Sequence, residues 1–185
     1  GSGLAHPFLD DVAAGLETGG LRVVRFDFPW RRATAEGAPR PPDGLPVLQQ
    51  CLRDVVATHA QGSALVLAGK SLGGRVATTL ADELAARAVV VFGYPFHPPR
   101  RPRQLRTEHL ATLRTPTLIL QGERDPFGTR QEVDGYALSS SIEVEWFADG
   151  DHSLAPRKRS GFTAEQHLHR ALQHALAFVH AALAR

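Results

Sequence analysis

The order of apolar segments predicts an α/β protein with a mostly parallel, doubly wound sheet. Strand-like runs alternate with helix-like runs along the chain, which is typical of a parallel sheet covered by helices. Residues 89–92, Val-Val-Val-Phe, are continuously apolar, as expected for a strand buried on both faces. A short glycine-rich turn at residues 69–74 joins one strand-like run directly to a helix-like run.

The first third of the chain predicts two helices around one strand. Residues 7–16 place Phe8, Val12 and Leu16 on one helical face, and Gly19-Gly20 ends this helix. Residues 21–28 favour a strand, and residues 30–44 are rich in Pro, Gly and Arg, which predicts a loop. Residues 45–59 form an amphipathic pattern and predict a helix.

The remaining chain continues the alternation. Apolar and β-branched runs predict buried strands, and the helix after the glycine-rich turn is expected to run to about residue 86. The expected strands cover residues 64–68, 88–92, 117–120 and 142–147; a short helix covers 107–113 and a long terminal helix covers 164–183.

Length and composition predict a single domain over residues 1–185, with no membrane partner. The formal charge is only +2, no apolar run approaches membrane-spanning length, and no signal peptide is visible. The single cysteine, Cys51, suits a reducing compartment and is interpreted as a small core residue, so we expect a cytoplasmic protein. No histidine cluster has metal-ligand spacing and no phosphate-binding loop is present, so neither a metal nor a cofactor is expected.

Positive residues gather in two loops. They are Arg100, Arg101, Arg103 and Arg106 in the first, and Arg157, Lys158 and Arg159 in the second. Neither loop contains interleaved aromatic residues or a nucleic-acid motif, so we expect no nucleic-acid partner. Solvated loops are the favoured interpretation, and attraction of an anionic substrate is the alternative.

The turn Gly-Lys-Ser-Leu-Gly-Gly at residues 69–74 predicts a nucleophile elbow. A G-x-S-x-G turn between a strand and a helix strains the serine backbone and exposes its hydroxyl. We expect Gly69 and Gly73 to let strand and helix approach closely. Ser71 is therefore the predicted nucleophile, and the backbone N–H of Leu72 the predicted oxyanion-hole donor.

A serine nucleophile needs a histidine base and an acid that orients the histidine. In the chain order typical of this elbow, the acid follows one strand and the histidine follows the next. Asp125 follows the expected strand at 117–120, and His152 follows the one at 142–147. Glu123 is a second candidate acid. Asp149 and Asp151 are nearer to His152 in sequence, but such adjacency rarely produces the required geometry.

The segment after residues 88–92 is expected to border the substrate pocket. Tyr94, Phe96 and His97 offer aromatic surface and a polar contact, so they are the candidate substrate-binding residues. For His97, and for His6 in another loop, a role in loop structure is an equal alternative.

The chain resembles the small, lidless α/β-hydrolases of the dienelactone-hydrolase-like group. Within that group it is similar to the branch that includes a testis-expressed hydrolase-like protein and a subunit of the non-specific lethal chromatin complex. Beyond the elbow and Asp-His-Ser at 151–153, the matching segments are His-Pro-Phe at 6–8, Val-Arg-Phe-Asp-Phe-Pro at 24–29, Gly-Tyr-Pro-Phe-His-Pro-Pro at 93–99, Leu-Arg-Thr-Glu-His-Leu at 105–110 and Gln-Gly-Glu-Arg-Asp-Pro-Phe-Gly at 121–128. The resemblance implies the α/β-hydrolase fold without a separate lid and a Ser71–Asp125–His152 triad.

The resemblance also implies an additional first strand, followed by a His-Gly-rich loop that donates a second oxyanion N–H. Gly1-Ser2-Gly3 is similar to the end of that loop, so the strand and the donor are expected before residue 1; a cloning remnant is the alternative. Taken together, the sequence predicts a serine hydrolase that cleaves a small ester or thioester through an acyl-enzyme. The alternative is a non-catalytic interaction module with the same fold.

Overall fold

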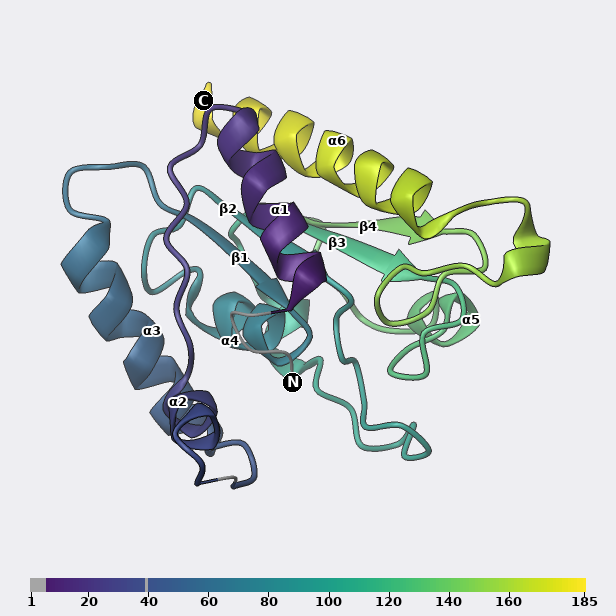
Figure 1. Ribbon diagram of the computed structural model, residues 1–185, viewed down its shortest axis with the longest axis horizontal. Coiled ribbons are helices and arrows are strands. Elements are labelled where there is room, and N and C mark those ends of the chain that lie inside the picture. Colours follow the sequence, from purple (N-terminus) through teal and green to yellow (C-terminus); the bar gives the residue numbers. More distant parts are fainter. Residues whose placement is uncertain (1–5, 39) are drawn as a thin grey trace. The chain divides into compact units, whose positions relative to one another are not determined.

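A computed structural model describes residues 6–38 and 40–185 (Figure 1). The chain forms two compact units, residues 1–63 and 64–185. All strands of the described residues lie in the second unit, together with every residue of the candidate site. A single domain over residues 1–185 stays a prediction.

The described residues of the first unit form three helices, and each has a proline in its first turn, where the missing N–H costs nothing. They are α1 (Pro7–Thr18), α2 (Pro29–Ala35) and α3 (Leu45–His59). The predicted helices at 7–16 and 45–59 are confirmed, and α1 extends two residues further before Gly19-Gly20.

Two predictions for this unit are wrong. Residues 21–28 form no strand in the structure, because alternation alone creates no strand without a hydrogen-bonded neighbour. Residues 29–35 form α2 instead of a loop. Pro29 presets a helical φ, and the Asp43 carboxylate accepts from the Trp30 N–H at 3.0 Å, which satisfies one open donor of the first turn.

The second unit is built on a parallel sheet. Its strands are β1 (Val66–Lys70), β2 (Ala88–Phe92), β3 (Thr117–Gly122) and β4 (Ile142–Phe147), in the spatial order β1-β2-β3-β4. In Figure 1, α6 (Ala164–Leu183) lies along one face of this sheet and α4 (Leu72–Leu80) on the other. β2 is buried along its whole length, as its apolar run predicted. This is the predicted α/β architecture.

Shorter elements connect the strands. They are η1 (Glu108–Ala111), α5 (Arg130–Val133) and η2 (Lys158–Ser160). Helix α4 ends at Leu80, earlier than predicted. A turn follows it, in which Ala85 adopts a left-handed φ of 50° and the Ala86 N–H bonds back to Ala81 O at 3.0 Å. Between β2 and β3, residues 93–116 form a loop and η1, with no inserted lid domain among these described residues.

Candidate functional site

Ser71 lies in a sharp turn between β1 and α4. Its backbone has φ 53° and ψ −116°, a conformation that is strained for any residue except glycine. The Ser71 N–H donates to Phe92 O at 3.2 Å and to Gly93 O at 3.1 Å, so the end of β2 supports the turn. The strand, turn and helix predicted around this serine are all present.

Glycines allow β1 and α4 to meet this closely, but not both of those that the sequence suggested. A Cβ on Gly69 would lie 2.4 Å from backbone atoms of Gly73 and Gly74, and a Cβ on Gly74 would lie 2.3 Å from Val91 Cγ1. A Cβ on Gly73 would meet no described atom within 4 Å. The expectation that the close approach depends on Gly73 was therefore wrong. Gly69 and Gly74 are the positions at which a side chain does not fit.

The structure brings Ser71, His152 and Asp125 together. Ser71 Oγ lies 2.8 Å from His152 Nε2, and His152 Nδ1 lies 2.7 Å from Asp125 Oδ2. The carboxylate only accepts, so Nδ1 carries the proton that it donates to Asp125, and Nε2 is left to accept from the Ser71 hydroxyl. These side chains follow β1, β4 and β3 respectively, at the carboxyl edge of the sheet.

Asp125 is completely buried and held by three donors. Besides His152, the Phe127 N–H donates to Oδ1 at 2.9 Å, and Gln121 Nε2 donates to Oδ2 at 2.8 Å. Sequence reasoning missed Gln121. The available signal was an amide side chain at the end of the otherwise apolar run Leu-Ile-Leu that precedes it in β3.

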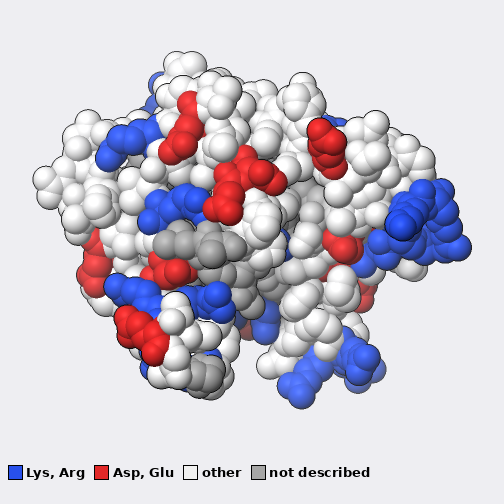
Figure 2. Space-filling view, viewed as in Figure 1, with Lys and Arg blue, Asp and Glu red and all other residues white. Residues whose placement is uncertain are grey.

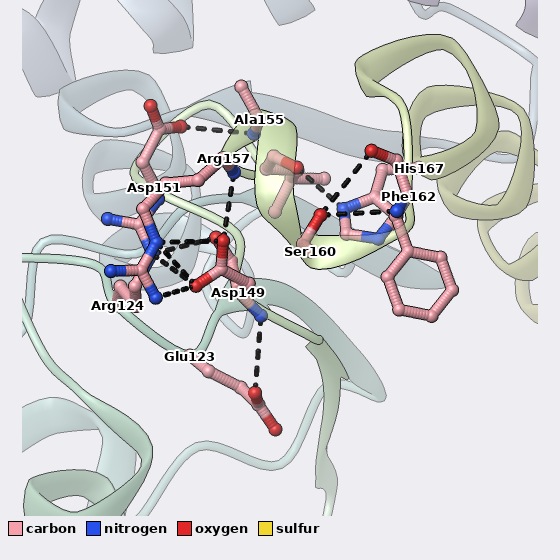
Figure 3. Close-up of polar contacts among 10 residues, drawn as sticks. Glu123, Arg124, Asp149, Asp151, Ala155, Arg157, Ser160, Phe162 and His167 are labelled. Carbon is pink, nitrogen blue, oxygen red and sulfur yellow. Dashed lines mark hydrogen bonds and ion pairs between the residues drawn. The ribbon is translucent and has the colours of Figure 1, made fainter.

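An ionic cluster holds the loop that carries His152 (Figure 3). The Asp149 carboxylate pairs with the Arg157 guanidinium, and Arg124 Nε donates to Asp149 O at 2.8 Å. The hydrogen bond from Arg157 keeps the pKa of Asp149 well below its usual range. The Asp149 N–H in turn donates to Glu123 Oε2 at 3.3 Å.

Asp151 hydrogen-bonds the part of the same loop that follows His152. Its Oδ1 accepts from the Ser153 N–H at 2.8 Å. The same oxygen accepts from the Ala155 N–H at 3.0 Å (Figure 3). Glu123, Asp149 and Asp151 are thus engaged in holding loops, and Asp125 is the carboxylate that His152 faces.

Glycines at two strand ends make room for the His152 loop. A Cβ on Gly93, whose φ is +70°, would lie 2.7 Å from His152 O, and a Cβ on Gly122 would lie 2.3 Å from Asp151 O. Lys70 Nζ donates to His152 O at 3.0 Å, and burial lowers the pKa of this lysine. The Phe127 ring lies against the imidazole of His152, with centroids 4.2 Å apart.

The candidate substrate-binding residues Tyr94, Phe96 and His97 are all buried, with at most 3% of each exposed. The Tyr94 hydroxyl donates to Arg106 O at 2.8 Å, and its pKa is raised by burial. The Phe96 ring packs between Tyr94 and Tyr136, at centroid distances of 4.8 and 5.7 Å.

Both ring nitrogens of His97 lie near oxygen atoms of the protein. Its Nδ1 lies 2.9 Å from Pro98 O, and its Nε2 lies 3.5 Å from Glu132 Oε2. Substrate contact by Tyr94, Phe96 and His97 stays a prediction, and their burial favours a role in supporting the site from beneath.

Leu72 is the first residue of α4, so its N–H has no partner within the helix. The helix dipole favours negative charge at this end of α4, and an oxyanion-hole role for the Leu72 N–H stays a prediction. The additional strand and the second oxyanion donor were expected before residue 1, and this expectation and the Gly1-Ser2-Gly3 segment behind it fall outside the described residues.

The basic loops are exposed and separate from each other. Figure 2 shows one group of lysine and arginine side chains at the position of η2 and a second group at the loop after β2, with a gap between the two groups. Arg157 is paired with Asp149, whereas Arg100, Arg101 and Arg103 project from the proline-rich loop. Attraction of an anionic substrate stays a prediction.

Over residues 6–38 and 40–185, no group of three or more His, Cys, Asp or Glu side chains is arranged to hold a metal ion. None of the helices in these residues combines the length and the apolar character needed to cross a membrane.

The parallel sheet, the strained turn at Ser71 and the acid and histidine at the strand ends define an α/β-hydrolase fold. Consistent with this fold, residues 1–180 match the family model described as "Alpha/beta hydrolase domain". The chain therefore belongs to the alpha/beta hydrolase family.

Solved structures share the fold at low sequence identity. A lidless alpha/beta serine hydrolase from Xanthomonas campestris is 20% identical, with a TM-score of 0.67 over 100% of this chain and 76% of the other. An alpha-beta serine hydrolase homologue from Coxiella burnetii is 19% identical, with a TM-score of 0.66 over 95% and 77%. The esterase domain of a Rhodothermus marinus protein is 19% identical, with a TM-score of 0.63 over 92% and 79%.

Proposed function

We propose that this member of the alpha/beta hydrolase family is a serine hydrolase that cleaves a small ester or thioester through an acyl-enzyme. One observation carries the proposal: a chain of two short hydrogen bonds runs from Ser71 through His152 to the buried carboxylate of Asp125. A serine on a strained turn needs neither of these partners for folding, whereas nucleophilic catalysis needs both.

In the first half-reaction, Ser71 Oγ attacks the substrate carbonyl carbon while His152 Nε2 takes the hydroxyl proton. Asp125 accepts from Nδ1–H throughout, which orients the imidazole and stabilises the cation that forms. The tetrahedral oxyanion is bound by the Leu72 N–H at the start of α4. His152 then gives its proton to the departing alkoxide or thiolate as the carbon–oxygen or carbon–sulfur bond breaks, leaving an ester on Ser71.

In the second half-reaction, water replaces the departed alcohol or thiol. His152 Nε2 takes a proton from the water, whose oxygen attacks the acyl carbon. Collapse of the second tetrahedral intermediate returns the proton to Ser71 Oγ and releases the carboxylic acid. The reaction consumes one water, and all of its proton transfers use His152.

Family membership and the names of the similar structures support this assignment. The words "serine hydrolase" and "esterase" describe two of those neighbours. The resemblance to the dienelactone-hydrolase-like group stays part of this proposal, and with it a substrate that enters without passing a lid. A cytoplasmic location is proposed from the single cysteine, Cys51, which is half-buried and unpaired.

The decisive experiment replaces the nucleophile. Ser71→Ala should reduce hydrolysis of p-nitrophenyl acetate by roughly 10⁴-fold or more and abolish labelling by a fluorophosphonate probe. Ser160→Ala is the matched control, because Ser160 lies in η2 and its hydroxyl hydrogen-bonds the Phe162 backbone. A parent protein that neither labels nor turns over would favour the non-catalytic interaction module.

A further inference from the structure

β2 and β3 diverge directly beneath the candidate site. Their pairing ends at Phe92 and Leu120, after which the Gly93 N–H still donates to Leu120 O at 2.9 Å. At Gly93 a positive φ of +70° interrupts the extended backbone of β2, and a Cβ at this position would lie 2.7 Å from His152 O. The next residue, Tyr94, therefore lies beyond the reach of the β3 backbone ladder.

The side chain of Gln121 fills this gap. Its Oε1 accepts from the Tyr94 N–H at 2.7 Å, and its Nε2 donates to Tyr94 O at 3.2 Å. The amide thus makes the two hydrogen bonds that a neighbouring strand would otherwise make. Gln121 is completely buried, so water does not compete for these contacts.

The same amide nitrogen reaches the acid of the site. Gln121 Nε2 donates to Asp125 Oδ2 at 2.8 Å and to Gly128 O at 3.3 Å. Asp125 Oδ2 is also the atom that accepts from His152 Nδ1, at 2.7 Å. One carboxylate oxygen is therefore shared between the imidazole and the amide.

We propose that Gln121 is a positioning residue that locks the Asp125 carboxylate toward His152 and limits how strongly that carboxylate attracts the proton on Nδ1. This inference rests on the proposed function. The locking follows because a buried carboxylate with donors on both oxygens has a single favourable rotamer. The limitation follows because a second donor on Oδ2 disperses charge that would otherwise favour the imidazolium.

Gln121→Met removes the amide while keeping nearly the same volume. The turnover number should fall about 10-fold or more, because the acid loses its fixed orientation. The acidic limb of kcat/KM should also move to higher pH. Without the second donor on Oδ2, the Asp125 carboxylate keeps more negative charge there and favours protonated His152. Thr117→Val is the matched control: Thr117 is fully buried, bonds Thr115 O at 2.9 Å, and lies at the start of β3 beside Val89 and Ile142, whereas Gln121 lies near its end.

A merely structural role predicts a different result. Gln121→Met would then lower the thermal midpoint as Thr117→Val does, leave the pH profile in place and lower turnover no more than the control; that result overturns the proposal.

Should Gln121→Met not fold, Gln121→Glu serves instead. A protonated carboxyl at this position keeps a donor to Asp125, whereas an ionised one does not. The activity of this variant should therefore fall at alkaline pH, and a pH profile equal to that of the parent overturns the proposal.

A proton NMR measurement separates this inference from the proposed function. The Nδ1 proton of His152, assigned by its absence in His152→Gln, should change its downfield shift in Gln121→Met and not in Thr117→Val. This readout needs no substrate. If the parent shows no hydrolysis but the resonance shifts as expected, the positioning by Gln121 stands and the hydrolase assignment fails. An unchanged resonance in an active enzyme overturns the positioning role alone.

Discussion

At the scale of single side chains, the orientation of His152 depends on the carboxylate that its Nδ1 faces. Asp125→Asn should reduce kcat by about 10⁴-fold, because a neutral amide permits the imidazole tautomer that cannot accept from Ser71. Glu123→Gln should have a small effect, since Glu123 accepts from the Asp149 N–H and pairs with Arg130. Steady-state kinetics on one ester compare the two variants directly, and the opposite ranking would assign the acid to Glu123.

At the scale of elements, the junction of β1 and α4 depends on which glycines lack space for a side chain. Gly74→Ala should destabilise the protein by about 1–3 kcal/mol, because its Cβ would meet Val91 in the fully buried β2. Gly73→Ala should be neutral or stabilising by up to about 1 kcal/mol, because alanine favours the helix and its Cβ meets no described atom within 4 Å.

Urea unfolding followed by circular dichroism measures both variants of this junction. The pair is well matched, because the substitutions are identical in chemistry and adjacent in the same helical turn. Equal losses of stability would show that helix geometry, and not contact with β2, selects glycine at these positions.

At the scale of the whole molecule, stability should depend on the protonation of His109, which joins η1 to α4. His109 Nε2 lies 3.0 Å from Thr78 Oγ1, and burial and the charge of Arg75 lower the pKa of His109 to about 4. Between pH 6.5 and 4 the unfolded chain therefore binds a proton here that the folded chain does not. The free energy of unfolding should fall as pH falls through this window.

His109→Gln isolates this contribution, because glutamine keeps an N–H donor for Thr78 and does not titrate. The parent should lose on the order of 1–2 kcal/mol more than the variant between pH 7 and pH 4.5, after discounting for the partial exposure of the ring. Urea unfolding at both pH values gives the difference. Parallel pH dependence in the two proteins would show that His109 protonates equally well when folded.

Features encoded within a few neighbouring residues could be predicted from the sequence. Helix α6 has the predicted bounds because the Thr163–Gln166 capping box marks its start, and α3 because its apolar period and first-turn proline are local signals. The elbow at Ser71 is local as well. The places of Asp125 and His152 follow from chain order, since each comes after a strand of one parallel sheet.

Features that require a distant partner were settled only by tertiary structure. Residues 21–28 have a strand-like pattern, yet pairing depends on a neighbour that the pattern does not specify. Gly74, not Gly73, lacks space because Val91 comes from another strand, and Gln121 contacts both Tyr94 and Asp125 because β2 and β3 diverge. Local propensity acts over one helical turn, whereas packing and buried hydrogen bonding depend on residues that only folding brings together.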